Sequence, residues 1–178
     1  MVRQVVTGHR DGKSVFVSDG TPLRSYDYQH AVGSGLTFAW ATPADTKLSL
    51  TDVAESVTVE TATIPKVGET RLLFLRVAPD SVAAAEGYDF AAAIAEMAAA
   101  SPDVTATFEQ SGFHRTDSID YVIVVQGEIS LELDDGAEKS FKAGDVIVQG
   151  GTRHAWRNRS NDVAVLAVIL VGAQRDNG

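Results

Sequence analysis

Hydrophobic and polar positions alternate with the period of a β-strand in the C-terminal part of the chain. In residues 128–134, EISLELD, polar and apolar side chains occupy every second position in turn. A period of two places the apolar side chains on one face of a strand and the polar ones on the other. From Val104 onward similar stretches follow one another: VTATFE, IDYVIVVQG, EISLELDDG, KSFKAGDVIVQ, RHAWRN and DVAVLAVILV. The pattern predicts a series of short strands, with a hairpin turn at Asp135-Gly136.

The N-terminal part is also rich in strand-forming sequence. Residues 2–6 and 14–18 flank an Asp11-Gly12 turn, because Asp-Gly readily adopts the positive φ angles of a tight hairpin. Residues 20–35 are polar, with Pro22 and three glycines, and are typical of an irregular surface segment. Further strands are expected at residues 36–42, 57–61 and 71–77, and the last of them is apolar on both faces, as a core strand is.

One helix is predicted, at residues 81–100. The stretch is dominated by alanine and contains Glu, which favour helix, and Asp80 or Ser81 can cap its start while Pro102 stops it. Phe90, Ile94 and Met97 are spaced by three and four residues. This spacing predicts that the helix packs on a sheet through these side chains.

The order of elements favours a mainly β fold. Many short strands joined by turns containing Gly are typical of a β-sandwich or barrel, whereas a parallel βαβ sheet requires alternating helices. The length of 178 residues fits one domain. We therefore expect a single domain over residues 1–178, in which 104–172 form the barrel core and 1–100 add strands and one helix around it.

Composition excludes several classes of function. The net charge is −9 and the pI is about 4.8, which opposes binding to the phosphates of nucleic acids. The chain has no cysteine, so a metal would need His, Asp or Glu as ligands, and the absence of disulfides suits a cytoplasmic protein. The apolar run VAVLAVILVGA is shorter than the roughly 18 to 20 residues that cross a bilayer, so no membrane association is expected.

Candidate chemistry lies in two strand-like stretches. Residues at alternate positions of an extended chain point to the same side, which groups His114, Thr116, Ser118 and Asp120 on one strand and His154 and Trp156 on another. Two imidazoles and a carboxylate can hold Fe(II), and the same donors suit Mn, Ni, Cu and Zn. Without a metal, His114 and His154 could instead transfer protons or bind a ligand by hydrogen bonds. Trp156 would then offer a flat apolar wall to the ligand.

These stretches resemble the two motifs of the cupin superfamily, G-x5-H-x-H-x3,4-E-x6-G and G-x5-P-x-G-x2-H-x3-N. In the first motif His114 takes the place of the first histidine, and Asp120 stands where the family has Glu, with six residues between it and Gly127. The residues that match the motifs are His114, Gly127, Gly144, Gly151, His154 and Asn158. The resemblance implies a double-stranded β-helix, which is a jelly-roll-like barrel, with a site for a small molecule inside it.

Three departures from the motifs matter for chemistry. Thr116 replaces the second histidine of the first motif, Asp120 is one methylene shorter than Glu, and Gln149 stands in the place of the proline. The resemblance implies a divalent transition metal held by His114, Asp120 and His154, with Thr116 and Trp156 contacting the ligand. The departures leave a metal-free pocket as an equal alternative.

Two functions follow as expectations. The first is an enzyme that acts on a small organic substrate, as cupin oxygenases, isomerases, decarboxylases and dehydratases do. The second is a ligand-binding or sensing cupin without catalysis, which Thr116 favours. Exposed strand edges invite pairing, so a homodimer through the N-terminal strands is also expected. The sequence does not indicate the substrate.

Overall fold

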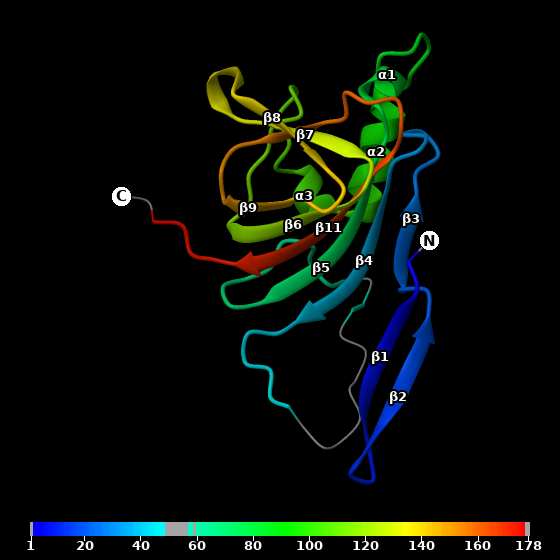
Figure 1. Cartoon of the computed structure of the whole chain (residues 1–178), viewed down its shortest axis with the longest axis vertical. Helices are drawn as coiled ribbons and strands as arrows, with labels where there is room; N and C mark the ends of the chain where they lie inside the picture. The colour runs from blue at the N-terminus through cyan, green and yellow to red at the C-terminus, as the bar shows by residue number, and fades with distance from the viewer. Residues whose placement is uncertain (1, 49–56, 59, 177–178) are drawn as a thin grey trace.

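The computed structural model describes residues 2–48, 57–58 and 60–176, and these form a mainly β molecule (Figure 1). One sheet has six strands in the order β3-β4-β5-β11-β6-β9, a second has the order β10-β7-β8, and β1 and β2 form a separate hairpin. All the pairings are antiparallel. The predicted fold class is therefore confirmed.

The strands have the following bounds: β1 Gln4–Arg10, β2 Lys13–Gly20, β3 Arg24–Asp27, β4 Gly35–Thr42, β5 Thr70–Val77, β6 Ser118–Gln126, β7 Glu128–Glu132, β8 Glu138–Lys142, β9 Val146–Gly150, β10 Ala155–Arg157 and β11 Ala164–Gly172. The helices are α1 Asp80–Ala83, α2 Phe90–Ala100 and α3 Pro102–Thr105, and a 3-10 turn spans Asp134–Gly136.

The core lies between the inner faces of the two larger sheets. Along β6, residues 118, 120, 122 and 124 are buried, whereas the residues between them are exposed. Val122 and Val124 pack in one apolar cluster with Phe38 of β4, Ile129 of β7 and Leu166 of β11. Burial of these side chains, at roughly 1.5 to 3 kcal/mol each, is the main source of stability that fixes the strand register.

The hairpin at the N-terminus forms as the sequence predicts. Asp11 and Gly12 adopt positive φ angles of 52° and 74°, and Arg10 pairs with Lys13 across the turn. The hairpin extends away from the sheets, at the lower right of Figure 1. At its base the side-chain amide of Gln4 donates a hydrogen bond to the Ala39 carbonyl, so the start of β1 lies beside β4.

Two expectations for the N-terminal part are wrong. The segment 20–35 contains a strand, β3, and its first residue Arg24 is buried although the segment looks like a polar surface loop. The described residues of the expected strand 57–61 lie in no strand, while residue 59 lies outside the described residues. Tertiary contacts decide both cases, because local strand propensity is weak compared with burial.

The predicted helix 81–100 is two helices. Residues 84–89 form a turn between α1 and α2, with Gly87 at a φ of 80°, a conformation that glycine adopts at no steric cost. Asp89, and not Asp80 or Ser81, caps α2, since its side chain accepts a hydrogen bond from the Ala92 N–H at 3.0 Å. The expected strand at VTATFE is also wrong, because α3 and a turn occupy most of it.

The expected packing of α2 through Phe90, Ile94 and Met97 is wrong for two of the three. Phe90 and Ile94 are exposed, while Ala93 and Ala100 are the buried residues of the helix. Small side chains let the helix approach the barrel closely. Met97 does face inward and lines the barrel cavity.

Polar groups attach α2 to the barrel at two places. Within the helix, the Glu96 carboxylate accepts hydrogen bonds from the backbone N–H groups of Gln29, at 2.6 Å, and His30, at 2.8 Å. At its C-terminal end the Arg24 guanidinium donates to the Ala100 carbonyl at 2.9 Å. A cation at a helix C-terminus also interacts favourably with the helix dipole. These contacts fix the helix over one side of the barrel.

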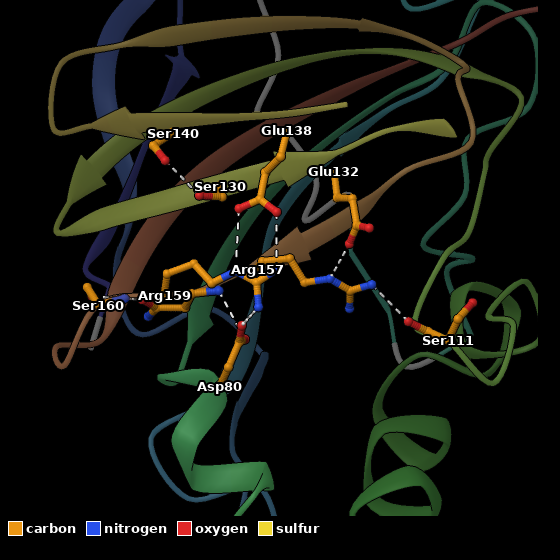
Figure 2. Close-up of polar contacts among 10 residues, drawn as sticks. Asp80, Ser111, Ser130, Glu132, Glu138, Ser140, Arg157, Arg159 and Ser160 are labelled. Atoms are coloured by element: carbon orange, nitrogen blue, oxygen red, sulfur yellow. Dashed lines mark hydrogen bonds and ion pairs between the residues drawn. The ribbon is translucent and has the colours of Figure 1, made fainter. Parts of the chain in front are cut away.

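A second polar cluster joins β10 to its neighbours, as Figure 2 shows. Arg157 donates to Glu132 of β7 at 2.7 Å and to the Ser111 carbonyl at 3.0 Å. Arg159 contacts both Glu138 of β8 and Asp80 of α1. The cluster therefore connects the three-stranded sheet with the start of α1.

Within the described part of the chain, no helix is long and apolar enough to cross a membrane.

Candidate functional site

His114 and His154 meet in the wall of the barrel. They form an isolated antiparallel bridge, in which each backbone N–H donates to the other's carbonyl, at 2.9 and 3.0 Å. Their ring centroids are 4.2 Å apart, with the ring planes at 50°. The bridge lies before β6 and before β10, so the ends of two strands bring together the two histidines that lie 40 positions apart in the sequence.

Both imidazoles are neutral at physiological pH. Burial, and to a smaller extent the neighbouring His154, lowers the pKa of His114 to about 4, and the backbone of Gly112 opposes this in part. Burial also lowers the pKa of His154, and the Thr152 carbonyl opposes it. A charged ring would lose its hydration in this position, which disfavours the protonated form.

A hydrogen bond selects the tautomer of His154. Its Nδ1 lies 3.0 Å from the Thr152 carbonyl oxygen, and a carbonyl can only accept, so Nδ1 carries the proton. The Nε2 of the neutral ring then carries the lone pair. Nδ1 of His114, in contrast, is buried and has no hydrogen-bond partner among the described residues.

Aromatic rings hold the two histidines from either side. Phe108 stacks on His114 with centroids 4.2 Å apart and planes at 22°, and Trp156 meets His154 edge to face at 5.8 Å. Trp156 was expected near the site because it shares a face with His154. Phe108 was not expected near the site, because the sequence predicts a separate strand there. The turn after α3 is what brings Phe108 to His114.

Thr116, Ser118 and Asp120 form a buried chain of hydrogen bonds. The Thr116 and Ser118 hydroxyls are 2.8 Å apart, and the Ser118 hydroxyl donates to Oδ1 of Asp120 at 2.6 Å. Burial raises the pKa of Asp120, and the bond from Ser118 opposes the rise. The carboxyl group is therefore held by its own strand and resists ionisation more than an exposed Asp does.

Gln149 is a site residue that the sequence analysis did not select. It is the cross-strand partner of Asp120 and is 3% exposed. Its Nε2 donates to the Thr152 hydroxyl at 3.4 Å, but its Oε1 is buried without a partner in the part of the chain that the structure describes. The signal that could have identified Gln149 is that it stands where the cupin motif has proline.

A cavity of about 330 Å³ lies between these residues. It is lined by all five residues predicted to contact a ligand or metal: His114, Thr116, Asp120, His154 and Trp156. The rest of its wall is mostly apolar and includes Leu73, Val168, Met97 and Phe108. A compact apolar cavity with a few convergent polar groups is typical of a small-molecule site.

The three predicted metal ligands do not form a ligand set. Across the described residues, no three His, Asp or Glu side chains are grouped so that they could hold a metal ion. The two histidine rings contact one another, whereas the Asp120 carboxylate accepts a hydrogen bond from Ser118 and is not grouped with them. The donors present do not fit a three-ligand centre, and metal binding by this chain stays a prediction.

Comparison with known proteins finds a cupin domain in the C-terminal part of the chain. The model of the cupin domain matches residues 106–171, which include both histidines. Phomopsin biosynthesis cluster protein C′ of Diaporthe leptostromiformis is 58% identical over 52 residues, which cover 29% of this chain and 28% of that protein. Oryzines biosynthesis cluster protein J of Aspergillus oryzae is 48% identical over 58 residues, 33% of this chain and 32% of that protein.

The cupin-domain-containing oxidoreductase virC of Hypocrea virens is 46% identical over 48 residues, which cover 27% of this chain and 25% of that protein. The chain thus spans a third or less of the length of these relatives. Among solved structures, a putative ethanolamine utilization protein of Salmonella typhimurium is 13% identical with a TM-score of 0.42, over 98% of each chain. An RmlC-like cupin of Methanocaldococcus jannaschii is 14% identical with a TM-score of 0.40, over 62% of this chain and 77% of that one. The match to the cupin domain model, together with the motif residues His114, Gly127, Gly144, Gly151, His154 and Asn158, identifies a cupin domain within residues 106–171.

Proposed function

We propose that this chain is a small-molecule enzyme whose active site is the barrel cavity, where His154 transfers a proton to or from a compact, largely apolar organic substrate. The observation that carries the proposal is the hydrogen bond from Nδ1 of His154 to the Thr152 carbonyl. This bond fixes the tautomer of His154 and leaves Nε2 as a base that faces the cavity. Burial lowers the pKa of the ring and keeps it neutral. His154 is then the proton-transfer group, and His114 supports it through ring contact.

The shape of the cavity supports a ring-shaped or unsaturated substrate. Its volume of about 330 Å³ holds a molecule of one or two rings, and Trp156 and Phe108 offer flat surfaces beside the two imidazoles. A charged substrate would lose its hydration without a free counter-ion, since both histidines are neutral and Arg76, which also lines the cavity, is paired with Asp27. We therefore expect a neutral substrate.

The unpaired Oε1 of Gln149 favours a substrate that carries a hydrogen-bond donor. An unpaired acceptor that is buried costs about 1 to 3 kcal/mol, and a hydroxyl or N–H group on the ligand would remove the cost. The acceptor lies across β6 and β9 from Asp120. The substrate we expect is thus a neutral, ring-sized compound with at least one O–H or N–H group.

The relatives favour an enzyme of small-molecule biosynthesis. Two of them are named as members of biosynthesis clusters, and another as an oxidoreductase. Of the reactions expected for cupins, isomerisation and dehydration need only proton transfer, which the histidines can supply. Oxygenase or oxidoreductase chemistry requires in addition an oxidant or a redox-active metal, such as Fe, Mn, Ni or Cu, and that requirement is testable.

The alternative function is a ligand-binding or sensing cupin with no catalysis. Thr116 favours it, because a threonine in place of the second motif histidine removes a ligand and a base together. Such a protein would use the same cavity, the same aromatic walls and Gln149. Binding alone therefore does not separate the two functions, and a test must measure proton transfer.

A probe reaction measures whether the cavity contains a base that acts on a bound ring. In 5-nitrobenzisoxazole a base removes the proton on C3, the N–O bond breaks, and the electron pair passes to oxygen to give 2-cyano-4-nitrophenolate, which is coloured. We expect the protein to accelerate this reaction above free imidazole at equal concentration, with saturation, and His154→Gln to abolish the acceleration. His30→Gln, in an exposed loop, is the matched control and should leave the rate unchanged.

The outcomes separate the two functions. A rate no higher than that of imidazole, in a protein that still binds 1-naphthol by tryptophan fluorescence, supports the non-catalytic alternative. An equal rate in His154→Gln and the parent contradicts the assignment of the base. Metal analysis of protein purified without chelator completes the test, because stoichiometric metal that His154→Gln loses would replace metal-free proton transfer with a metal enzyme.

A further inference from the structure

Thr63 and Ser101 place two buried hydroxyl groups in the cavity wall, on segments that carry neither histidine. Thr63 is 1% exposed and Ser101 is 5% exposed, and both line the cavity. The Ser101 hydroxyl donates to Oγ1 of Thr63 at 2.9 Å. We call these two groups the hydroxyl pair. The proton transfer assigned to His154 uses neither of them.

Arg24 directs a second donor at the Thr63 oxygen. Its Nη2 lies 3.4 Å from Oγ1 of Thr63, which is a long hydrogen bond, and a guanidinium can only donate. Arg24 is 4% exposed, and its described hydrogen bonds go to oxygens of Thr61, Thr63 and Ala100, none of which is a carboxylate. A buried cation without an anionic partner lowers the cost of negative charge that develops nearby.

The proton of the Thr63 hydroxyl remains for a ligand. Ser101 and Arg24 both donate to Oγ1, so neither bond uses the proton that Thr63 itself carries. No acceptor for this proton lies among its hydrogen-bond partners in the described part of the chain. A hydroxyl that accepts two bonds is polarised and donates more strongly. Thr63 therefore presents a donor to the same cavity in which Gln149 presents an acceptor.

Neighbouring bonds hold the hydroxyl pair in place. One oxygen of Asp103 accepts from the Ile64 N–H, next to Thr63, at 2.7 Å, and the other lies 3.4 Å from the Ser101 hydroxyl. The Ser101 carbonyl accepts from the Thr105 hydroxyl at 2.8 Å. A donor that its surroundings fix before a ligand binds needs no reorganisation when charge develops on that ligand.

The helix α3 connects the hydroxyl pair with the histidines. Ser101 precedes α3, and Phe108, which stacks on His114, follows it. Ser101, Phe108 and His114 all line the cavity. A helix of four residues is roughly 6 Å long, which is comparable with the length of one or two fused rings. A ring bound along this wall reaches from the hydroxyl pair toward the imidazoles.

We propose that Thr63 binds the carbonyl oxygen of the substrate, a ring-sized ketone or enone with an acidic C–H group beside the carbonyl, and that Arg24 positions and polarises Thr63. The assignment rests on the proposed function, in which Nε2 of His154 is the base. His154 takes the proton from that carbon, the C–H electron pair forms the C=C bond of an enolate, and the carbonyl π pair moves to oxygen. Thr63 then donates to an oxygen that carries negative charge. Return of the proton to another carbon of the extended enolate isomerises an enone.

A neutral carbonyl fits this wall better than a carboxylate does. Thr63 supplies one donor, and Arg24 does not itself line the cavity, so a fully formed anion would lose more hydration than these groups replace. Charge that develops only in the transition state is instead met by donors already in place.

Binding of a ketone and of its hydrocarbon tests the donor without catalysis. 2-Tetralone has a carbonyl where tetralin has a methylene group. Thr63→Val should lower the affinity for 2-tetralone about 5- to 10-fold and leave that for tetralin unchanged, because valine keeps the shape of threonine and removes one hydrogen bond. Thr37→Val is the matched control, since Thr37 is also buried but its hydroxyl contacts Ser25 outside the cavity. Quenching of tryptophan fluorescence measures the affinities.

A double-mutant cycle separates the effect of Arg24 on Thr63 from its effect on the fold. Arg24→Lys should reduce the preference for 2-tetralone over tetralin in the parent and should have no further effect on it in the Thr63→Val background. A purely structural role would weaken both ligands alike in both backgrounds. Far-UV circular dichroism checks that all variants fold.

Deuterium exchange tests the chemistry. In heavy water, enolate formation replaces the protons on the carbon between the carbonyl and the aromatic ring of 2-tetralone with deuterium, which NMR follows. The parent should accelerate this exchange with saturation, and Thr63→Val should lower kcat at least about 10-fold with a smaller change in KM. Tyr28→Phe tests the rival donor, because the Tyr28 phenol also lines the cavity.

The outcomes separate this inference from the proposed function. Equal affinity of the parent and Thr63→Val for 2-tetralone overturns the role of Thr63, and so does a preference for the ketone that only Tyr28→Phe removes. A parent that uses His154 on 5-nitrobenzisoxazole but exchanges no deuterium into 2-tetralone overturns the carbonyl substrate and leaves the base in place. A preference for 2-tetralone that depends on Thr63, in a parent that accelerates neither reaction, supports the donor and contradicts the proposed base.

Discussion

Asp120 and Gln149 are cross-strand partners on β6 and β9, and both side chains line the barrel cavity. Burial raises the pKa of Asp120, while Oε1 of Gln149 has no partner in the described chain. The pair places a carboxyl group that resists ionisation opposite an amide oxygen that can accept a hydrogen bond. Neither property is part of the usual cupin motifs, since the chain has Asp for Glu and Gln for Pro at these positions.

Gln149→Leu should change which ligands the cavity binds. We expect the affinity for 1-naphthol to fall about 5- to 10-fold, because a hydrogen bond is worth about 1 kcal/mol, while the affinity for naphthalene stays equal or rises. Fluorescence of Trp156 in a Trp40→Phe background measures both. Gln110→Leu, at an exposed position, is the control. An equal loss of affinity for the two ligands would show that Gln149 shapes the cavity without accepting a hydrogen bond.

The same substitution should not destabilise the fold. Leucine removes an acceptor that is buried without a partner, so the free energy of unfolding should stay equal or rise by up to about 2 kcal/mol. Urea denaturation monitored by circular dichroism checks this. A loss of more than about 1 kcal/mol would mean that the weak bond to Thr152 supports the fold.

Stability should decrease as the pH falls from about 6.5 to about 4. The pKa of His114 is near 6.5 in the unfolded chain and about 4 in the folded one, so the unfolded state binds more protons in this window. The stabilisation is complete above pH 6.5, and about 3 kcal/mol of it is lost toward pH 4. The pKa of His154 is also lowered and acts in the same direction.

Asp120 partly offsets the loss of stability at low pH. Its pKa is raised on folding, so its contribution is present at low pH and is lost as the pH rises through its folded pKa. His114→Gln isolates the histidine, because the variant should lose most of the slope between pH 6.5 and 4. His30→Gln should keep it. Urea titrations at half-unit pH steps measure the slopes, and a parent whose stability is flat over this window would contradict a buried neutral His114.

The sequence predicted the barrel well because its signals are local. Alternation along residues 118–126 and 128–132 and the Asp11-Gly12 turn each lie within a few residues, and the structure contains the expected strands and hairpin. The motif spacing also brought His114, Asp120 and His154 to one cavity. The spacing could not show that the Asp120 carboxylate accepts a hydrogen bond from Ser118, because side-chain geometry decides that.

The errors cluster where distant segments decide the structure. Alanine favours helix along the whole of residues 81–100, yet Gly87 divides it, and α2 is buried through Ala93 and Ala100 instead of its larger side chains. Phe108 reaches His114 only because α3 and the following turn replace the expected strand. Arg24 is the clearest case, since nothing near it in the sequence indicates that it is buried.

Arg24 joins three segments that are far apart in the sequence. Its guanidinium donates to the carbonyls of Thr61 and Ala100, lies 3.4 Å from the Thr63 hydroxyl, and stacks over the Phe38 ring at 4.6 Å. Arg24→Met should therefore lower the free energy of unfolding by about 2 to 4 kcal/mol, because it removes the guanidinium donor from the buried Ala100 carbonyl and the partly buried Thr61 carbonyl. Arg24→Lys should recover only part of this loss, since a single ammonium cannot reach all three acceptors.

The matched control for Arg24 is Arg3→Met. Arg3 makes an ion pair with Asp19 at 2.6 Å, but both side chains are at least half exposed, and such pairs contribute little. Urea denaturation should therefore separate the two arginines by at least about 1 kcal/mol. Because Arg24 holds the C-terminal end of α2, Arg24→Met should also weaken 1-naphthol binding, and equal stability of the two methionine variants would contradict a role for Arg24 in fixing the helix over the cavity.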